Sequence, residues 1–251
     1  MKPPADHFSV VAPAYAACRP AYPDELFEYL AGLTELHELA WDCAAGSGQA
    51  TIPLARIFRR VRATDVSDAM LAQAPAHPRV EYRVAPAPDS GLEGSSADLV
   101  TVAQALHWLE LDTFYPEVDR VLKAGGVLAV WSYGNQHLED EALDHVLRRF
   151  YHDIVGPYWP AGRRHVEAGY RTLPFPYDEL EAPTITMKER WTLSELVGYI
   201  GTWSATQRFR ESEGVDPLIE LERQLAPRWG PPDTARSVHW PLSLRVGRHP
   251  T

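Results

Sequence analysis

The order of segments over residues 38–65 is the feature that most restricts the fold of this chain. A short apolar run, ELAWDC, contains Asp42 and leads into the small-residue loop AAGSGQA; a helix-like segment then leads to a second apolar run, VRATD, which ends in Asp65. Small residues between a strand and a helix let the backbone approach a ligand closely, and the N–H groups at a helix N-terminus favour an anionic group. These residues predict a strand–loop–helix–strand unit whose loop either holds a cofactor or is only a tight turn.

Strand-like and helix-like segments alternate through the first half of the chain. The strand-like segments are short and apolar on both sides, and helix-like segments or lengths sufficient for a crossover separate them. We therefore predict a doubly wound α/β domain with a mostly parallel sheet over about residues 34–135. The predicted strands are 38–43, 61–64, 80–85, 98–103 and 126–132, and the predicted helices are 23–33, 51–58, 67–74 and 114–123.

The composition changes after Phe150, where Trp, Tyr, Pro and Arg become frequent. Helix-like patterns cover residues 193–203 and 216–229, and a last strand is predicted at 240–248. We divide the chain into a cofactor-binding α/β domain with an N-terminal helical segment (1–149), an aromatic-rich helical lid (150–237) and a strand that returns to the sheet (238–251). The aromatic side chains of the lid segment either contact a substrate or form ordinary core.

Charge and cysteine content exclude several classes of protein. The formal net charge of −10 argues against nucleic-acid binding, because such binders depend on clustered Lys and Arg. Cys18 and Cys43 cannot build a disulfide framework or a four-ligand zinc site, so we expect no metal and a reducing, cytoplasmic location. We also expect no signal peptide and no membrane helix, since no window approaches the roughly 18 uncharged residues that a membrane helix needs.

The loop itself discriminates between cofactors. A dinucleotide fingerprint, G-x-G-x-x-G, would need glycine where Gln49 stands, and this disfavours an NAD-linked oxidoreductase. The frame D-x-A-x-G-x-G instead resembles the D/E-x-G-x-G-x-G loop of class I S-adenosylmethionine-dependent methyltransferases, with Ala44 in place of the first glycine. The stretches AYAACRPAYP, ATDVSDAMLAQA, DLVTVAQALHWL, RVLKAGGVLAVWSYG, TWSA and WPLSLRVGR extend the likeness to the type 11 methyltransferases, within the branch similar to trans-aconitate methyltransferases.

This resemblance implies a seven-stranded Rossmann-like methyltransferase fold and S-adenosylmethionine as cofactor. It places Asp42, Ala44, Gly46 and Gly48 at the methionyl end, Asp65 at the ribose, Val66, Met70, Ala87 and Pro88 around the adenine, and Gln104 and Ala105 under the sulfonium. Pro88 stands where the family has an acidic residue, and it has no N–H to donate. Two alternatives stay open: Asp65 caps the helix that follows it, or Asp42 only orients the loop.

The methyl acceptor is predicted to be a small molecule. The amino-methylating signature of nucleic-acid enzymes is missing after the fourth strand, where AQALHW stands instead. His107, the candidate catalytic residue, is a base for a weakly acidic hydroxyl, a donor that positions an acid, or a structural residue beside Trp108. A carboxylate acceptor has a reference pKa near 4 and needs no base, whereas a phenol, with a pKa near 10, gains from one.

Cationic and aromatic side chains are the candidates for acceptor binding. Arginine grips a carboxylate with two hydrogen bonds, although a surface ion pair is the other interpretation of each arginine considered. The candidate substrate residues are Tyr15, Arg19, Trp108, Trp159, Tyr170 and Trp203, and the further arginines considered are Arg163, Arg164, Arg171 and Arg245.

The sequence leads to one function and three alternatives. We expect O-methylation of a carboxylic acid; the alternatives are methylation of a phenol or other hydroxyl, cofactor binding without transfer, and the disfavoured oxidoreductase. A monomer or weak homodimer is expected.

Overall fold

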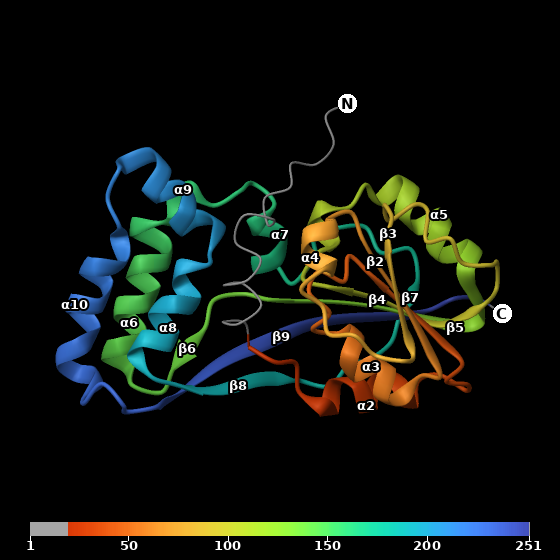
Figure 1. The fold of residues 1–251 in the computed structure, drawn as a ribbon, viewed down its shortest axis with the longest axis horizontal. Helices are drawn as coiled ribbons and strands as arrows, with labels where there is room; N and C mark the ends of the chain where they lie inside the picture. Colours follow the sequence, from red (N-terminus) through yellow and green to blue (C-terminus); the bar gives the residue numbers. More distant parts are fainter. Residues whose placement is uncertain (1–19, 251) are drawn as a thin grey trace.

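A computed structural model describes residues 20–250. Its centre is a sheet of five parallel strands in the spatial order β3-β2-β1-β4-β5 (Figure 1). Each strand is followed by a helix or a crossover, as the alternation of segments predicts. The strands are β1 (Leu39–Cys43), β2 (Arg60–Asp65), β3 (Val80–Val84), β4 (Ala97–Ala103) and β5 (Leu122–Tyr133).

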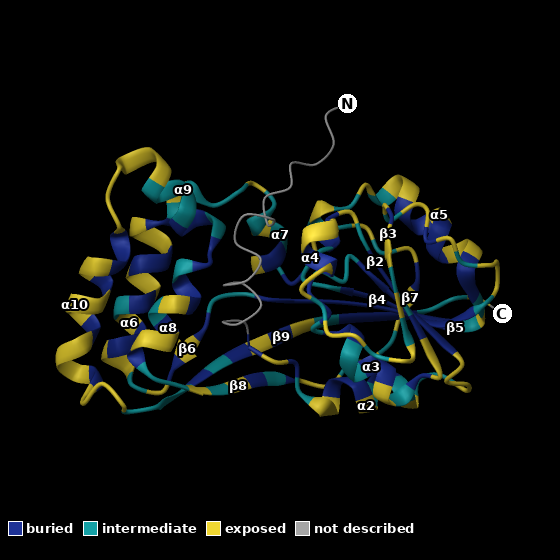
Figure 2. Cartoon of the chain, in the orientation of Figure 1, coloured by how far each residue is buried: buried dark blue, intermediate teal, exposed yellow. Residues whose placement is uncertain are grey.

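The central strands β1, β4 and β5 are buried on both faces, which explains why they read as continuous apolar runs, whereas the edge strand β3 is largely exposed. Neighbouring residues of β4 join different apolar clusters: Leu99 packs with helices α2 and α3, whereas Val100 packs with α5. Figure 2 shows β4 and β5 as a buried centre between partly exposed helices. The helices on the two faces are α2 (Asp24–Gly32) and α3 (Thr51–Ile57) on one, and α5 (Leu111–Val121) on the other. The short helix α4 (Asp68–Leu71) follows β2.

The last strand, β9 (Arg236–Arg248), is thirteen residues long and joins two parts of the molecule. Its residues 242–248 pair antiparallel with β5, within the last strand predicted at 240–248. Its residues 236–241 extend past the parallel sheet and pair with β8. The expected number of seven strands is therefore too low for the described residues, whose sheet has nine. The additional short strands along β9 are β6 (His137–Leu138), β7 (Asp178–Glu179) and β8 (Thr186–Trp191).

A group of helices lies beside the far half of β9, on the left of Figure 1. Apolar side chains of α6, α8 and α10, such as Leu147, Ile200 and Leu225, share one cluster with Val238 of β9. The predicted helices 193–203 and 216–229 are confirmed as α8 and α10. The members of the group are α6 (Glu141–Arg149), α8 (Leu193–Gly201), α9 (Ser204–Glu213) and α10 (Pro217–Trp229).

Short helical segments connect this group to the sheet. The connecting segments are η2 (Phe150–Ile154), η3 (Gly156–Tyr158) and α7 (Arg163–Glu167). No helix within residues 20–250 has both the length and the apolar character that crossing a membrane requires.

Candidate functional site

Asp42 lies near the carboxyl end of β1 and is completely buried. Its carboxylate accepts hydrogen bonds from the hydroxyls of Thr51 at 2.5 Å and Thr101 at 2.9 Å. Burial raises the pKa of this carboxyl to about 6, because the low-dielectric interior disfavours the charged form. Thr51 begins α3 and Thr101 belongs to β4. Asp42 therefore ties both the helix after the loop and the neighbouring strand to β1, as expected for a residue that orients the loop.

The loop after β1 turns through three left-handed residues. Ala44, Gly46 and Gly48 have φ angles of 57°, 54° and 82°. A Cβ on Gly48 would lie 3.1 Å from the Tyr82 hydroxyl oxygen, so a larger residue would crowd that side chain, and the left-handed backbone favours glycine here. Ala44, which replaces the family's first glycine, adopts the left-handed region at a cost of about 1–2 kcal/mol for an L-residue. Residues 44–46 remain partly exposed at the edge of the sheet.

Asp65, at the end of β2, is bound to the glycine loop. Its carboxylate accepts the backbone N–H groups of Gly46 and Ser67, each at 2.9 Å. The cap of α4 is a different residue, because the Ser67 hydroxyl accepts the N–H of Met70. The helix-cap alternative therefore applies to Ser67, and Asp65 links the strand end to the loop.

The other predicted cofactor residues lie along the same edge of the sheet, where the carboxyl ends of parallel strands meet. Val66 is 60% exposed, and the methyl group of Met70 lies against Gly46. Ala87 and Ala105 are partly buried, and Pro88 is exposed. A carboxylate beside small backbone-exposing residues matches the hydroxyls of a ribose and the small cross-section of a methionyl chain, so this edge fits S-adenosylmethionine.

Gln104 fixes the turn that follows β4. Its side-chain amide donates to the carbonyl of Tyr133 at 2.9 Å and accepts the N–H of the same residue at 3.0 Å. Its backbone has a left-handed φ of 56° and donates to the carbonyl of Trp131. This pairing extends the contact between β4 and β5 by side-chain hydrogen bonds. It directs the chain into η1 (Leu106–Trp108), which carries His107.

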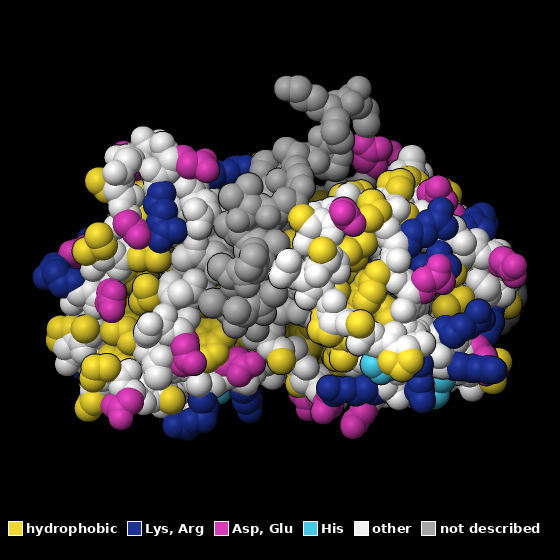
Figure 3. Space-filling model, in the orientation of Figure 1, with side chains coloured by type: hydrophobic (Ala, Val, Ile, Leu, Met, Phe, Trp, Pro, Cys, Tyr) yellow, Lys and Arg dark blue, Asp and Glu magenta, His cyan; other side chains and the backbone are white. Residues whose placement is uncertain are grey.

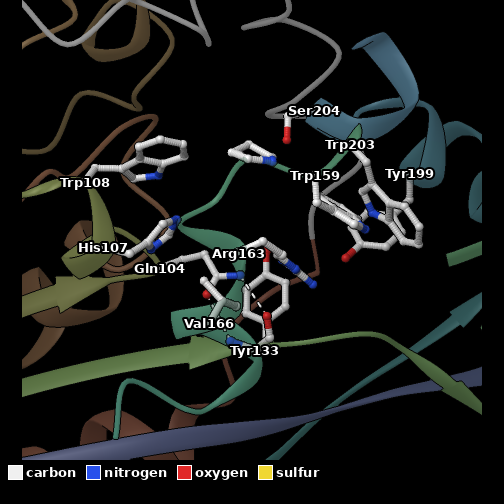
Figure 4. Close-up of a pocket in the computed structure, with 11 residues that line it drawn as sticks. Gln104, His107, Trp108, Tyr133, Trp159, Arg163, Val166, Tyr199, Trp203 and Ser204 are labelled. Atoms are coloured by element: carbon white, nitrogen blue, oxygen red, sulfur yellow. Dashed lines mark hydrogen bonds between the residues drawn. The ribbon is translucent and has the colours of Figure 1, made fainter. Parts of the chain in front are cut away.

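A cavity opens beside this turn, between the sheet edge and the helical group (Figure 4). Aromatic rings of Trp159, Tyr199 and Trp203 form one wall, with the centroids of Trp159 and Trp203 5.6 Å apart. Trp108 stands on the opposite side in Figure 4. The residues that line the cavity are Gln104, His107, Trp108, Tyr133, Trp159, Pro160, Arg163, Val166, Tyr199, Trp203 and Ser204.

His107 lies between Tyr170 and Trp108. Its Nδ1 lies 3.0 Å from the hydroxyl oxygen of Tyr170, and its ring centroid lies 4.7 Å from that of Trp108. Burial, followed by the nearby positive charges of Arg163 and His165, lowers the pKa of this imidazole to about 4. The imidazole is therefore neutral at neutral pH.

The predicted substrate residues separate into three groups. Trp108, Trp159 and Trp203 line the cavity, whereas Tyr15 and Arg19 lie outside the described residues. Tyr170 does not line the cavity, because its side chain is fully buried behind His107 and its hydroxyl contacts the imidazole.

The arginines considered are also placed differently. Among the described lining residues, Arg163 supplies the cationic group. Arg245 is buried in an ion pair with Glu179, which Arg171 also approaches at 4.0 Å. Arg164 is exposed.

Five lining residues were not predicted from the sequence. Tyr199 and Trp203 are four residues apart in a predicted helix, and this spacing places side chains on one face. That signal identifies Tyr199. The other four were Tyr133, Pro160, Val166 and Ser204.

Comparisons with known proteins place the chain in a family. A family model described as a methyltransferase domain matches residues 41–130. A Dictyostelium discoideum protein named as a methyltransferase is 32% identical, over 88% of this chain and 85% of its own length. A solved structure named as a type II methyltransferase of Anaeromyxobacter dehalogenans is 46% identical, covers 92% of this chain and 98% of its own, and superposes with a TM-score of 0.88. The chain belongs to the S-adenosylmethionine-dependent methyltransferases.

The name of a third relative is consistent with this family. A Saccharomyces cerevisiae protein named as an S-adenosylmethionine-dependent methyltransferase is 28% identical over 62% of this chain and 58% of its own length. The expected enzyme class, cofactor and Rossmann-like fold of this methyltransferase are confirmed. The finer assignment to a trans-aconitate branch is not, because none of these names specifies an acceptor.

Cofactor binding predicts a measurable stabilisation of this methyltransferase. S-adenosylhomocysteine at about 100 times its dissociation constant is expected to add roughly 2.7 kcal/mol to the free energy of unfolding, because it binds only the folded state. Thermal unfolding with and without the ligand measures the effect, and NAD serves as the control and is expected to leave the melting temperature unchanged. An unchanged melting temperature at millimolar S-adenosylhomocysteine would contradict cofactor binding.

Proposed function

We propose that this methyltransferase transfers a methyl group to the carboxylate of a small-molecule acid. The observation that carries the proposal is that one cavity is lined both by the Arg163 guanidinium and by a His107 imidazole whose pKa is about 4. The guanidinium can bind a carboxylate, and the imidazole is a weak base. A carboxylate has no proton to lose at neutral pH, so it is the acceptor that this pair suits.

The cofactor-binding residues in this proposal are those at the carboxyl edge of the sheet. S-adenosylmethionine supplies an already reactive methyl group on a positively charged sulfur, which leaves the protein to align the acceptor and to exclude water. Asp65 would accept the ribose hydroxyls from the position in which Gly46 and Ser67 hold it. The remaining proposed contacts are Asp42, Ala44, Gly46 and Gly48 at the methionyl end, Val66, Met70, Ala87 and Pro88 at the adenine, and Gln104 and Ala105 beside the sulfur.

His107 takes the role of a positioning donor in this proposal. If the Tyr170 hydroxyl donates to Nδ1, the proton of the neutral imidazole stands on Nε2 and can be donated to an acceptor oxygen. A base for a phenol would work best with a pKa near the operating pH, and the lowered pKa of His107 argues against that role.

The segment 150–237 is proposed to cover the acceptor. Trp159, Arg163 and Trp203 come from this segment, while Gln104 and His107 come from the α/β part. The aromatic wall also supports a second candidate, a phenolic acceptor whose ring stacks on Trp159 or Trp203. For the oligomeric state, we predict a monomer or a weak homodimer.

A panel of acceptors tests the proposed function directly. Purified enzyme is incubated with S-adenosylmethionine and with matched acids, phenols and alcohols, and methyl esters and ethers are separated by mass spectrometry. Ester formation from acids supports the proposal. Ether formation from phenols without any ester would replace it with the second candidate, and binding of S-adenosylhomocysteine without any product would indicate a cofactor-binding protein without transfer.

The pH dependence of turnover gives an independent prediction. With cofactor and acid saturating, we expect the rate to be nearly flat between pH 7 and 9, since this window lies above the pKa of the acid (near 4), of His107 (about 4) and of Asp42 (about 6). His107→Gln should lower the rate through lost positioning without changing the shape of the profile. A steep acid limb near pH 6.5 that disappears in this variant would show that His107 is a general base for a hydroxyl acceptor.

A further inference from the structure

The surroundings of Arg163 restrict how many negative charges an acceptor can carry. Its side chain is 16% exposed, and its guanidinium lies 4.5 Å from the ring centroid of Trp159 and 5.4 Å from that of Tyr151. Its Nε donates to the Tyr151 hydroxyl at 2.6 Å. Within residues 20–250 the two outer nitrogens make no hydrogen bond to the protein, so the paired face of the guanidinium fork is available to a ligand.

A second donor stands beside this fork. The Nε1–H of Trp159 is buried and has no partner in the described part of the chain, although the residue lines the cavity. A buried donor without an acceptor destabilises a protein, and a carboxylate in the cavity would supply that acceptor. Because Trp159 and Arg163 stack on each other, one carboxylate could reach both donors.

Tyr151 and Glu167 hold Arg163 in this orientation. The Tyr151 hydroxyl accepts from Arg163 and donates to Glu167 Oε1 at 2.6 Å. Glu167 Oε1 also lies 4.0 Å from Arg163 Nε. The pair Tyr151–Glu167 thus orients the inner side of the guanidinium and places a negative charge behind it.

Few charged groups of the described residues stand at the Arg163 fork. Arg163 contributes one positive charge, Glu167 contributes one negative charge just outside the lining, and His107 is neutral. A first carboxylate pairs with Arg163. A second carboxylate would find no other cationic side chain among the described lining residues and would lie against aromatic rings, where an unpaired charge is costly.

We propose that this cavity selects acceptors with one carboxylate on an apolar body, and that Tyr151 and Glu167 are the positioning residues that set this selectivity. The inference rests on the proposed function. The carboxylate binds Arg163 and Trp159 Nε1, and the apolar body packs on Trp203 and Tyr199.

Two matched acid pairs test the selectivity: hexanoate against adipate, and phenylacetate against 1,4-phenylenediacetate. The expected kcat/KM of the wild-type enzyme is at least roughly tenfold higher for the monocarboxylate of each pair, because the second charge stays unpaired. Equal values, or a preference for the dicarboxylates, would overturn the inference while leaving carboxylate methylation intact.

Variants separate positioning from structure. Tyr151→Phe is expected to raise KM for the monocarboxylates roughly tenfold with kcat within about threefold, because Arg163 loses its acceptor. Glu167→Gln is expected to lower the mono-to-dicarboxylate ratio roughly fivefold, since the repelling charge is removed. Tyr158→Phe and Glu213→Gln are the matched controls, because this exposed tyrosine–glutamate pair lies outside the cavity and should leave both values unchanged. A change in kcat alone, or an unchanged ratio in Glu167→Gln, would contradict the positioning role.

The failure of the proposed function has a different signature. If no acid is methylated, calorimetric titration of the same four acids into enzyme saturated with S-adenosylhomocysteine still measures the selectivity. Tighter binding of the monocarboxylates would support the inference for an acid that binds without being the acceptor, and no binding of any acid would overturn it.

Discussion

Replacing Arg163 with Met is expected to lower kcat/KM for an acid acceptor by about 100-fold, or roughly 2.7 kcal/mol of transition-state stabilisation. The reason is that the variant removes the charge-assisted hydrogen bonds to the carboxylate while keeping much of the apolar contact with Trp159. Steady-state kinetics on the best acid of the acceptor panel measures the loss. Arg163→Lys should be intermediate, because lysine keeps the charge but lacks the planar fork.

The neighbouring arginine provides the control for this experiment. Arg164 is exposed and does not line the cavity, so Arg164→Met removes the same charge from the same helix without touching the acceptor. Its kcat/KM should match the wild type, and S-adenosylhomocysteine should bind both variants with unchanged affinity. A value for Arg163→Met within threefold of the wild type would exclude Arg163 from acceptor binding.

Replacing Asp65 with Ala is expected to weaken cofactor binding at least tenfold. Each charge-assisted hydrogen bond from a ribose hydroxyl is worth about 1.5–3 kcal/mol, and the variant removes the carboxylate that would accept them. The same change frees the N–H groups of Gly46 and Ser67, so the glycine loop loses part of its support as well. Calorimetric titration with S-adenosylhomocysteine gives the affinity.

Two further variants show whether the effect belongs to the carboxylate. Asp65→Asn keeps one acceptor oxygen and should lose less affinity than Asp65→Ala. Asp68→Ala removes an exposed negative charge from the adjacent helix α4 and should bind like the wild type. Circular dichroism of all three variants checks that the fold is retained. If Asp65→Ala binds within threefold of the wild type, Asp65 lies outside the cofactor site.

The parallel sheet could be predicted from the sequence because its central strands are buried on both faces. All five residues of β1 are buried, and apolar runs of this kind are visible without knowledge of their partners. β8 and α9 were not predicted, for the opposite reason. The sequence of β8, TMKERW, mixes charged and apolar residues, and α9 buries only Ala205 and Thr206 among ten positions. Neither segment carries the apolar period by which an element is recognised.

The candidate site was most predictable where its residues are neighbours in the chain. The residues from Asp42 to Gly48 are consecutive at the end of one strand, so their pattern is visible in the sequence, although Thr101 and Asp65 hold them from β4 and β2. The cavity instead depends on segments that meet through tertiary packing, as in the contact of His107 with Tyr170 and the effect of Arg163 on the pKa of His107. An aromatic residue such as Tyr170 can either line a cavity or support another residue from within the core. Its complete burial behind His107 shows that it is a support.

Strand β9 has a consequence for how the protein is synthesised. It follows every other described strand in the chain, yet it pairs with β5 and also carries β8 and the helices around it. While a ribosome has produced only the first five strands, the edge of β5 has no partner, and an apolar unpaired edge is a template for aggregation. Neither the parallel sheet nor the helical group can finish folding until the same thirteen residues of β9 have left the ribosome. A translational pause before Arg236 should prolong the exposure of that edge and the need for a chaperone.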